Sequence, residues 1–108
     1  MLFYSTNKTS PAVSFKEATI NGQAPDGGLY FPERIPVVDP ELIGNIRNYS
    51  NEEIAYRVIA PYVGEDIPEA VLRQIVKETV DFEIPLVKVN ERMASLELFH
   101  GPTLAFKD

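Results

Sequence analysis

The residues best placed for chemistry surround Lys107, near the end of the sequence. Leu104, Ala105 and Phe106 precede this lysine directly, and a Gly-Pro turn separates the segment from a predicted strand. Apolar neighbours partly desolvate a lysine and disfavour its charged ammonium form. The neutral amine is the form that makes a Schiff base. The segment therefore indicates Schiff-base chemistry at Lys107, whereas a lysine without such neighbours is ordinarily a solvated surface residue.

Other residues with chemical potential are few. His100 has a side chain suited to proton transfer, although a loop histidine more often serves only as a hydrogen-bonding group. We interpret Asp26-Gly27-Gly28 as a tight turn rather than a ligand loop, because such dipeptides mark turns. One histidine and no cysteine exclude histidine-rich and thiolate metal sites. Neither a G-x-x-x-x-G-K-[ST] nor a G-x-G-x-x-G motif offers a phosphate cradle.

Length and composition indicate one small folded domain. The 108 residues are 44% hydrophobic and 24% charged, both ordinary for a soluble globular protein. A net charge of −6 without a basic stripe argues against binding to nucleic acid or an anionic membrane. No run of about 18 apolar residues is present to span a bilayer. Residues 1–8 lack the apolar core of a signal peptide, so we expect a cytoplasmic protein.

Short strands and one helix are predicted for the first third of the chain. Residues 2–5 are apolar and β-prone, which favours a strand. A helix is predicted from about residue 14 to residue 20, because Ser14 and Glu17 have the spacing of a capping box. The segments that follow are a turn at 24–28, a strand at 29–31 and an extended loop at 32–40.

Three amphipathic helices are predicted between residue 40 and about residue 80. The first begins at Pro40-Glu41, Ser50 and Glu53 form the capping box of the second, and Asp66 with Glu69 begins the third. Helical periodicity predicts two buried faces, Ile54, Val58, Ile59 and Tyr62 on the second helix and Val71, Leu72, Ile75 and Val76 on the third. Acidic residues near helix starts are interpreted as caps: Glu52, Glu53, Glu65, Asp66 and Glu69.

The end of the chain is predicted to be a β-hairpin. Leu86–Val89 alternates as a strand, Asn90-Glu91 makes a turn, and Met93–Phe99 returns as a second strand. The predicted fold class is therefore α+β, a small N-terminal domain with short strands, amphipathic helices and a C-terminal hairpin. We divide the chain into an N-terminal region, residues 1–84, and a hairpin with the lysine segment, residues 85–108.

The lysine segment also carries a family resemblance. Residues 97–108, Glu-Leu-Phe-His-Gly-Pro-Thr-Leu-Ala-Phe-Lys-Asp, resemble the pyridoxal-phosphate attachment motif of the threonine synthase family. Three upstream segments are similar to the amino-terminal region of the same family: Tyr4-Ser5-Thr6, Ser14–Ala18 and Ala24–Pro32. The resemblance covers essentially the whole chain, whereas enzymes of this family are several hundred residues long. We therefore expect the chain to be an N-terminal fragment.

The resemblance implies a fold-type-II pyridoxal-phosphate enzyme, related in architecture to the tryptophan synthase β-subunit. It implies conversion of O-phospho-L-homoserine and water to L-threonine and phosphate, the last step of threonine biosynthesis. It further implies that Lys107 is the catalytic residue and covalent ligand of the cofactor, and that the Phe106 ring stacks on the cofactor. His100, Thr103 and Asp108 are implied to shape the substrate pocket, without individual roles.

Several alternatives stay open from sequence. The family's phosphate cup and most substrate ligands lie downstream of the lysine motif, so we expect this chain alone to bind the cofactor weakly and to be inactive. The alternatives are another fold-type-II lyase, a non-catalytic relative that keeps the fold, and a small α+β interaction module. Apolar strand surface in residues 96–106 predicts that the chain associates with itself.

Overall fold

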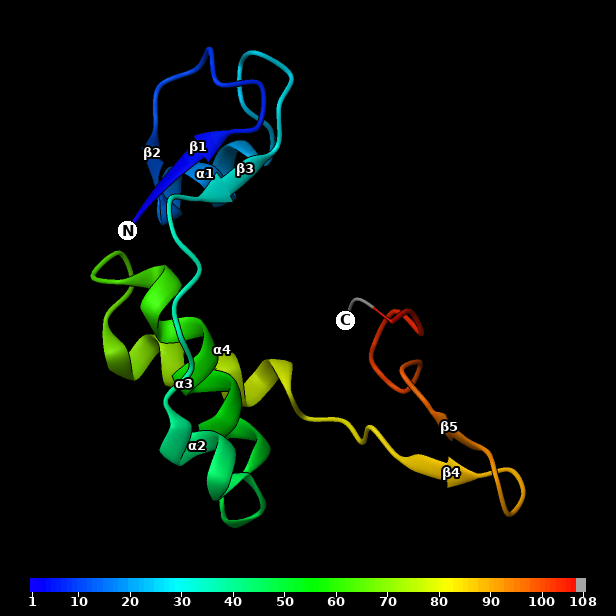
Figure 1. Ribbon diagram of the computed structural model, residues 1–108. Coiled ribbons are helices and arrows are strands. Elements are labelled where there is room, and N and C mark those ends of the chain that lie inside the picture. Colours follow the sequence, from blue (N-terminus) through cyan, green and yellow to red (C-terminus); the bar gives the residue numbers. More distant parts are fainter. Residues whose placement is uncertain (107–108) are drawn as a thin grey trace.

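A three-stranded sheet, a helical region and a hairpin follow one another along the chain (Figure 1). The computed structural model describes residues 1–106. The predicted α+β class, with short strands, amphipathic helices and a terminal hairpin, is confirmed. The elements in chain order are β1 (Leu2–Ser5), β2 (Val13–Ser14), α1 (Phe15–Asn21), β3 (Tyr30–Pro32), α2 (Pro40–Gly44), the 3-10 turn η1 (Ile46–Asn48), α3 (Asn51–Val63), α4 (Glu69–Thr79), β4 (Leu86–Lys88) and β5 (Ala94–Leu96).

The first sheet is antiparallel, with β1 between β2 and β3. The predicted strand at residues 2–5 is confirmed as β1. The second strand was predicted at residues 29–31 and lies one residue further on, through Pro32. Proline is tolerated there because β3 is an edge strand and needs no ladder donor on its open side. The two-residue strand β2 was not predicted, since so short a segment carries no alternating pattern.

Helix α1 packs against the sheet through aromatic side chains. The rings of Phe3 and Phe15 meet edge to face, with centroids 5.8 Å apart. The predicted capping box is confirmed, because Ser14 accepts from the Glu17 N–H and the Glu17 carboxylate accepts from the Ser14 N–H. Asp66 was predicted to begin the last helix, and this prediction was wrong. Its carboxylate accepts from the Lys16 N–H at 2.8 Å, and so caps α1 from the loop between α3 and α4.

The core of the helical region lies between α3 and α4. Val63, Leu72 and Val76 are buried at its centre. The predicted face of α3 was partly right, because Ile59 packs against this core and Ile54 and Tyr62 are half-buried, whereas Val58 is exposed. The other residues of α3 that pack against the core are Ala55, Tyr56 and Ala60. On α4 the prediction was half right, because Leu72 and Val76 are buried whereas Val71 and Ile75 are exposed. Among residues 1–106, no helix combines the length and apolar character needed to cross a membrane.

The starts of α2 and α3 differ in detail from the predictions. Ser50 caps α3 by accepting from the Glu53 N–H, but the reciprocal half of the predicted box does not form. The Glu53 carboxylate instead accepts from Arg57 at 2.8 Å and Arg73 at 3.0 Å. Charge-assisted bonds to guanidinium groups are stronger than a bond to a neutral N–H, which explains the exchange. The predicted helix after residue 40 is interrupted at Asn45, which separates α2 from η1.

The hairpin extends away from the rest of the chain (Figure 1). Leu86 pairs with Leu96 and Lys88 with Ala94, and every residue of the two strands is exposed. The radius of gyration is 16.8 Å, whereas a compact chain of this length has about 13 Å. The second strand was predicted to reach residue 99 but ends at Leu96. The ladder closes one residue later, where the Glu97 N–H donates to the carbonyl of Pro85, because β4 offers no partner beyond that point.

Candidate functional site

The predicted site residues belong to the segment that follows β5 and folds back on itself (Figure 1). The structure places His100, Thr103 and Phe106 in this segment, and all three are exposed. Lys107 and Asp108 lie outside the described residues. Residues 97–106 contain neither helix nor strand, so side-chain contacts and turns determine the course of this segment.

His100 is held by two neighbours. Its Nε2 atom lies 2.6 Å from Oε2 of Glu97, within hydrogen-bond distance. Its ring stacks on that of Phe99, with centroids 4.8 Å apart and planes 25° apart. Sequence reasoning singled out His100 but missed Glu97, although an acidic residue three positions before a histidine was a visible signal. The structure shows a carboxylate–imidazole pair that engages Nε2 of the ring, and the His100 side chain is 40% exposed.

A tight turn separates His100 from the lysine. The Leu104 N–H donates to the carbonyl of Gly101 at 3.0 Å, and this bond closes the turn. Leu104 has a φ of 58°, in the left-handed region that a bulky side chain rarely adopts. Such a conformation costs about 1–2 kcal/mol and is typical of functional segments. The turn therefore stores strain in the residues that lead to Lys107.

Phe106 combines an exposed ring with a contact to the chain before the hairpin. Its side chain is 81% exposed. Together with Ala105 and Leu98 it lines a hollow of about 50 Å³, whose remaining lining residues are Phe82 and Ile84. The residues before Lys107 therefore lie beside the linker between α4 and β4, and most of the Phe106 ring stays available for another planar group.

A second polar cluster surrounds Asp26, in the turn between α1 and β3. Its Oδ1 accepts from the Ser5 hydroxyl at 2.5 Å and from the Gly28 N–H at 3.0 Å. Its Oδ2 accepts from both the N–H and the hydroxyl of Thr9 and from the Ser10 N–H. These bonds, above all the one from Ser5, hold the pKa of Asp26 far below its ordinary range. The interpretation as a tight turn is confirmed, and all donors to this carboxylate come from the chain itself.

Sequence reasoning missed the loop that this carboxylate holds. Residues 5–10, Ser-Thr-Asn-Lys-Thr-Ser, supply four of the five donors to Asp26. The density of hydroxyl side chains opposite a lone aspartate was the available signal. The cluster fixes the β1–β2 loop against the turn before β3.

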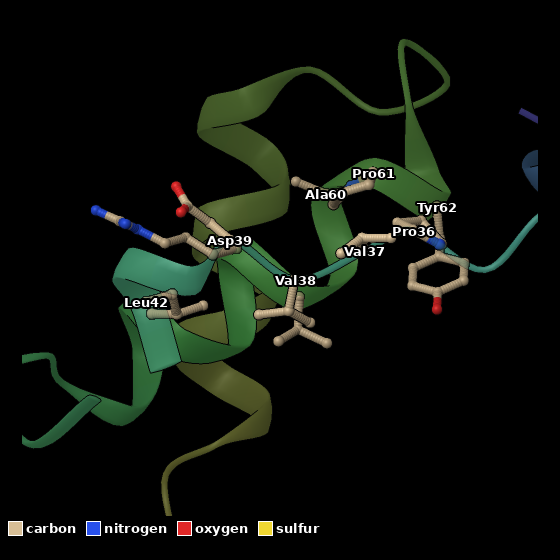
Figure 2. Close-up of a pocket in the computed structure, with 10 residues that line it drawn as sticks. Pro36, Val37, Val38, Asp39, Leu42, Ala60, Pro61 and Tyr62 are labelled. Carbon is tan, nitrogen blue, oxygen red and sulfur yellow. The ribbon is translucent and has the colours of Figure 1, made fainter. Parts of the chain in front are cut away.

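A larger hollow of about 320 Å³ lies between α3 and the chain that enters α2 (Figure 2). Figure 2 shows Val37, Val38 and Leu42 on one side and Ala60 and Pro61 of α3 on the other. The lining is mainly apolar. The Arg57 guanidinium at its edge is engaged by Glu41 and Glu53 and lies over the Tyr49 ring. Within residues 1–106 no group of three or more acidic or histidine side chains could hold a metal ion.

Comparison with known proteins gives a consistent family match. Residues 2–80 match the family described as threonine synthase N terminus. The chain is 41% identical over its whole length to a threonine synthase of Pseudomonas aeruginosa, and covers 24% of that protein. It is 40% identical to a threonine synthase of Saccharomyces cerevisiae, where the match covers 99% of this chain and 23% of the relative.

A solved structure shares the fold. The chain superposes on the X-ray structure of PLP-bound threonine synthase from Brucella melitensis with a TM-score of 0.87 and 40% identity. The match covers 99% of this chain and 24% of that one. The chain therefore spans about a quarter of the length of the relatives that it matches.

Proposed function

The chain belongs to the threonine synthase family, and from this premise we propose that it is the N-terminal part of a pyridoxal-phosphate-dependent lyase. The proposed reaction converts O-phospho-L-homoserine and water to L-threonine and phosphate. The observation that carries the proposal is the match of the whole chain, lysine segment included, to threonine synthases at about 40% identity. We propose a small-molecule substrate, no nucleic-acid or membrane partner, and a cytoplasmic location in keeping with a biosynthetic enzyme.

The residues of the lysine segment fit one end of the cofactor. Lys107 offers an amine for a carbonyl group, and the ring of Phe106, 81% exposed, offers a face for a flat heterocycle. The cofactor's phosphate and ring nitrogen need further partners. We place these partners in the three quarters of the relatives' length that this chain does not span.

We assign roles to the chain's own residues on this basis. Lys107 holds the cofactor and carries protons between substrate carbons, while Phe106 orients the ring. His100, Thr103 and Asp108 shape the substrate pocket. The bound cofactor supplies an electron sink. The strained turn at Leu104 orients the residues that follow it, because a fixed turn limits the directions that the chain can take after it.

The proposed domain boundary lies between residues 84 and 85. Residues 80–85 form neither helix nor strand, and β4 begins at Leu86. The family match ends at residue 80, which supports a division close to this linker. On this proposal residues 1–84 form the N-terminal region, and residues 85–108 begin the cofactor-binding domain.

The activity is tested on the full-length protein encoded by the gene. The assay measures phosphate release from O-phospho-L-homoserine, together with threonine formation. We expect activity in the wild type, loss in Lys107→Ala and full activity in Lys88→Ala, an exposed lysine of β4. Release of phosphate without threonine would favour another lyase, and absence of both products would favour a non-catalytic relative or an interaction module.

The 108-residue chain alone is proposed to bind the cofactor weakly and to lack activity. A single covalent anchor without phosphate ligands contributes little binding energy. The chain is mixed with pyridoxal phosphate and dialysed, and its absorbance spectrum is recorded. A cofactor band that survives dialysis and disappears in Lys107→Ala would contradict the proposal.

The chain alone is also proposed to associate with itself through the hairpin. Leu86 and Leu96 face solvent with 70% and 56% of their surface exposed, and both outer strand edges lack a neighbour within residues 1–106. Unpaired apolar edges favour pairing with another chain. We expect sedimentation velocity to show dimers or larger species that Leu96→Lys reduces. The control Leu29→Lys, at a similarly exposed residue directly before β3, should not reduce them. A monomer at all concentrations would refute this.

A further inference from the structure

A carboxylate–imidazole pair joins the base of the hairpin to the segment that leads to Lys107. Oε2 of Glu97 and Nε2 of His100 are 2.6 Å apart. The backbone of Glu97 is fixed as well, because its N–H donates to the Pro85 carbonyl at 3.0 Å and extends the β4–β5 ladder. The pair therefore links a hydrogen-bonded hairpin to residues 98–106, which have no helix or strand.

The two neighbours of His100 determine which ring atom remains available. A carboxylate only accepts hydrogen bonds, so a neutral imidazole beside Glu97 carries its hydrogen on Nε2. Phe99 covers one face of the ring. Nδ1 has no hydrogen-bond partner within residues 1–106, and the side chain is 40% exposed. Nδ1, which the bond to Glu97 leaves without a hydrogen, can therefore accept a proton from a bound molecule.

We propose that Glu97 is a positioning residue for His100, and that Nδ1 of His100 accepts and returns a proton in the substrate pocket of the proposed lyase. This inference rests on the proposed function, because it requires a substrate beside the lysine segment. The water that the proposed reaction consumes gives one proton to Nδ1 as its oxygen forms the new carbon–oxygen bond. The ring releases that proton to solvent before the next turnover, and the phosphate, whose bond to the substrate carbon breaks, takes up one proton from solvent. No oxidant, reductant or further reactant is required.

The first test observes the pair without substrate or cofactor. His100 is the only histidine in the 108-residue sequence, so NMR of the chain labelled with 15N-histidine gives one pair of ring nitrogen signals. We expect a hydrogen on Nε2 that exchanges slowly with solvent. It should exchange about tenfold faster in Glu97→Gln, because a charge-assisted bond is lost. Glu91→Gln, in the hairpin turn, is the matched control. A neutral ring with its hydrogen on Nδ1, or equal exchange in the two variants, overturns the pairing.

The second test measures steady-state kinetics on the full-length protein. We expect His100→Ala to lower kcat by roughly 10²–10⁴-fold with little change in KM, as for loss of a general base. Glu97→Gln should lower kcat about tenfold, because one charge-assisted bond to the ring is lost. The double variant should be no slower than His100→Ala, since Glu97 acts through the ring. A double variant that multiplies the two losses overturns the positioning role, and a wild-type kcat in His100→Ala overturns the proton role.

The two tests separate this inference from the proposed function. A wild-type protein that leaves O-phospho-L-homoserine unchanged refutes the proposed function and, with it, the proton role of Nδ1. The NMR experiment still decides whether Glu97 holds His100 in the predicted tautomer. An active wild type with an unaltered Glu97→Gln variant overturns the inference and leaves the function standing.

Discussion

An added methyl group at Gly28 would meet severe steric obstruction. A Cβ there would lie 2.1 Å from the Ser5 hydroxyl oxygen and 2.8 Å from the Asn7 nitrogen. Cβ atoms essentially never approach other heavy atoms closer than 3.0 Å. Ser5 is fully buried and donates to Asp26 at 2.5 Å, so it cannot rotate away without losing this bond. Gly28→Ala must therefore separate the β1–β2 loop from the turn before β3.

The magnitude follows from two costs. Overpacking a close-packed site costs about 1–3 kcal/mol. A buried Ser5 hydroxyl left without its partner costs about 1–3 kcal/mol more. We expect Gly28→Ala to lower the free energy of unfolding by about 2–6 kcal/mol. At the lower end, this corresponds to a fall in Tm of about 8–16 °C for a domain of this size.

Thermal and urea unfolding, followed by circular dichroism, measure the effect. Gly44→Ala is the matched control, because no atom lies within 4 Å of the added methyl group and the residue is in α2. Its stability should equal or slightly exceed that of the wild type. In a Ser5→Ala background, Gly28→Ala should cost less, since the nearest obstructing atom is gone. A wild-type Tm for Gly28→Ala, or an equal cost in both backgrounds, would refute the steric explanation.

Three further predictions concern charges and backbone strain. The folded-state pKa of Asp26 is depressed, so its contribution to stability is complete above about pH 4 and is lost as the pH falls below that value. Tm measured from pH 7 to pH 2 should therefore fall more steeply in the wild type than in Asp26→Asn, and parallel curves would contradict this. Glu53→Gln removes the ion pairs with Arg57 and Arg73 and should lower Tm in low salt. The difference in Tm between wild type and variant should become smaller in about 1 M salt, and a difference independent of salt would exclude an electrostatic cause. Leu104→Gly should leave cofactor incorporation in the full-length protein intact, whereas Leu104→Val should reduce it, because a β-branched residue adopts a φ of 58° poorly. Cofactor incorporation is measured as absorbance of the bound cofactor, and equal absorbance of the two variants would disprove the importance of this turn.

The local elements were largely predictable because their signals lie within a few residues of one another. The Ser14–Glu17 box begins α1, and the glycine after Asn21 ends it with a φ of 68°. The hairpin was predicted from alternating residues on both sides of Asn90, whose side chain accepts from the Arg92 and Met93 N–H groups. In each case one short stretch supplies both the donor and the acceptor.

Two of the errors share a cause, which is competition from other partners for the same carboxylate. Asp66 caps α1 rather than its own helix, because the tertiary fold brings the Lys16 N–H to its carboxylate. The Glu53 carboxylate accepts from two arginines instead of the Ser50 N–H, and one of these arginines lies twenty residues further along the chain. A pattern of spacings identifies groups that can form a bond, but several partners compete, and the folded arrangement decides between them.

From sequence alone, the residues from Glu97 to Asp108 predicted the chemistry of the lysine segment, because they combine a lysine, apolar neighbours and a family resemblance. The sequence also determined most of the helix and strand positions, which depend on local hydrogen bonds and periodicity. Three features became known only from the folded arrangement: Glu97 pairs with His100, Asp26 binds the β1–β2 loop, and α3 buries the residues that pack against Val63. These depend on distances between side chains, and such distances exist only once the backbone has folded.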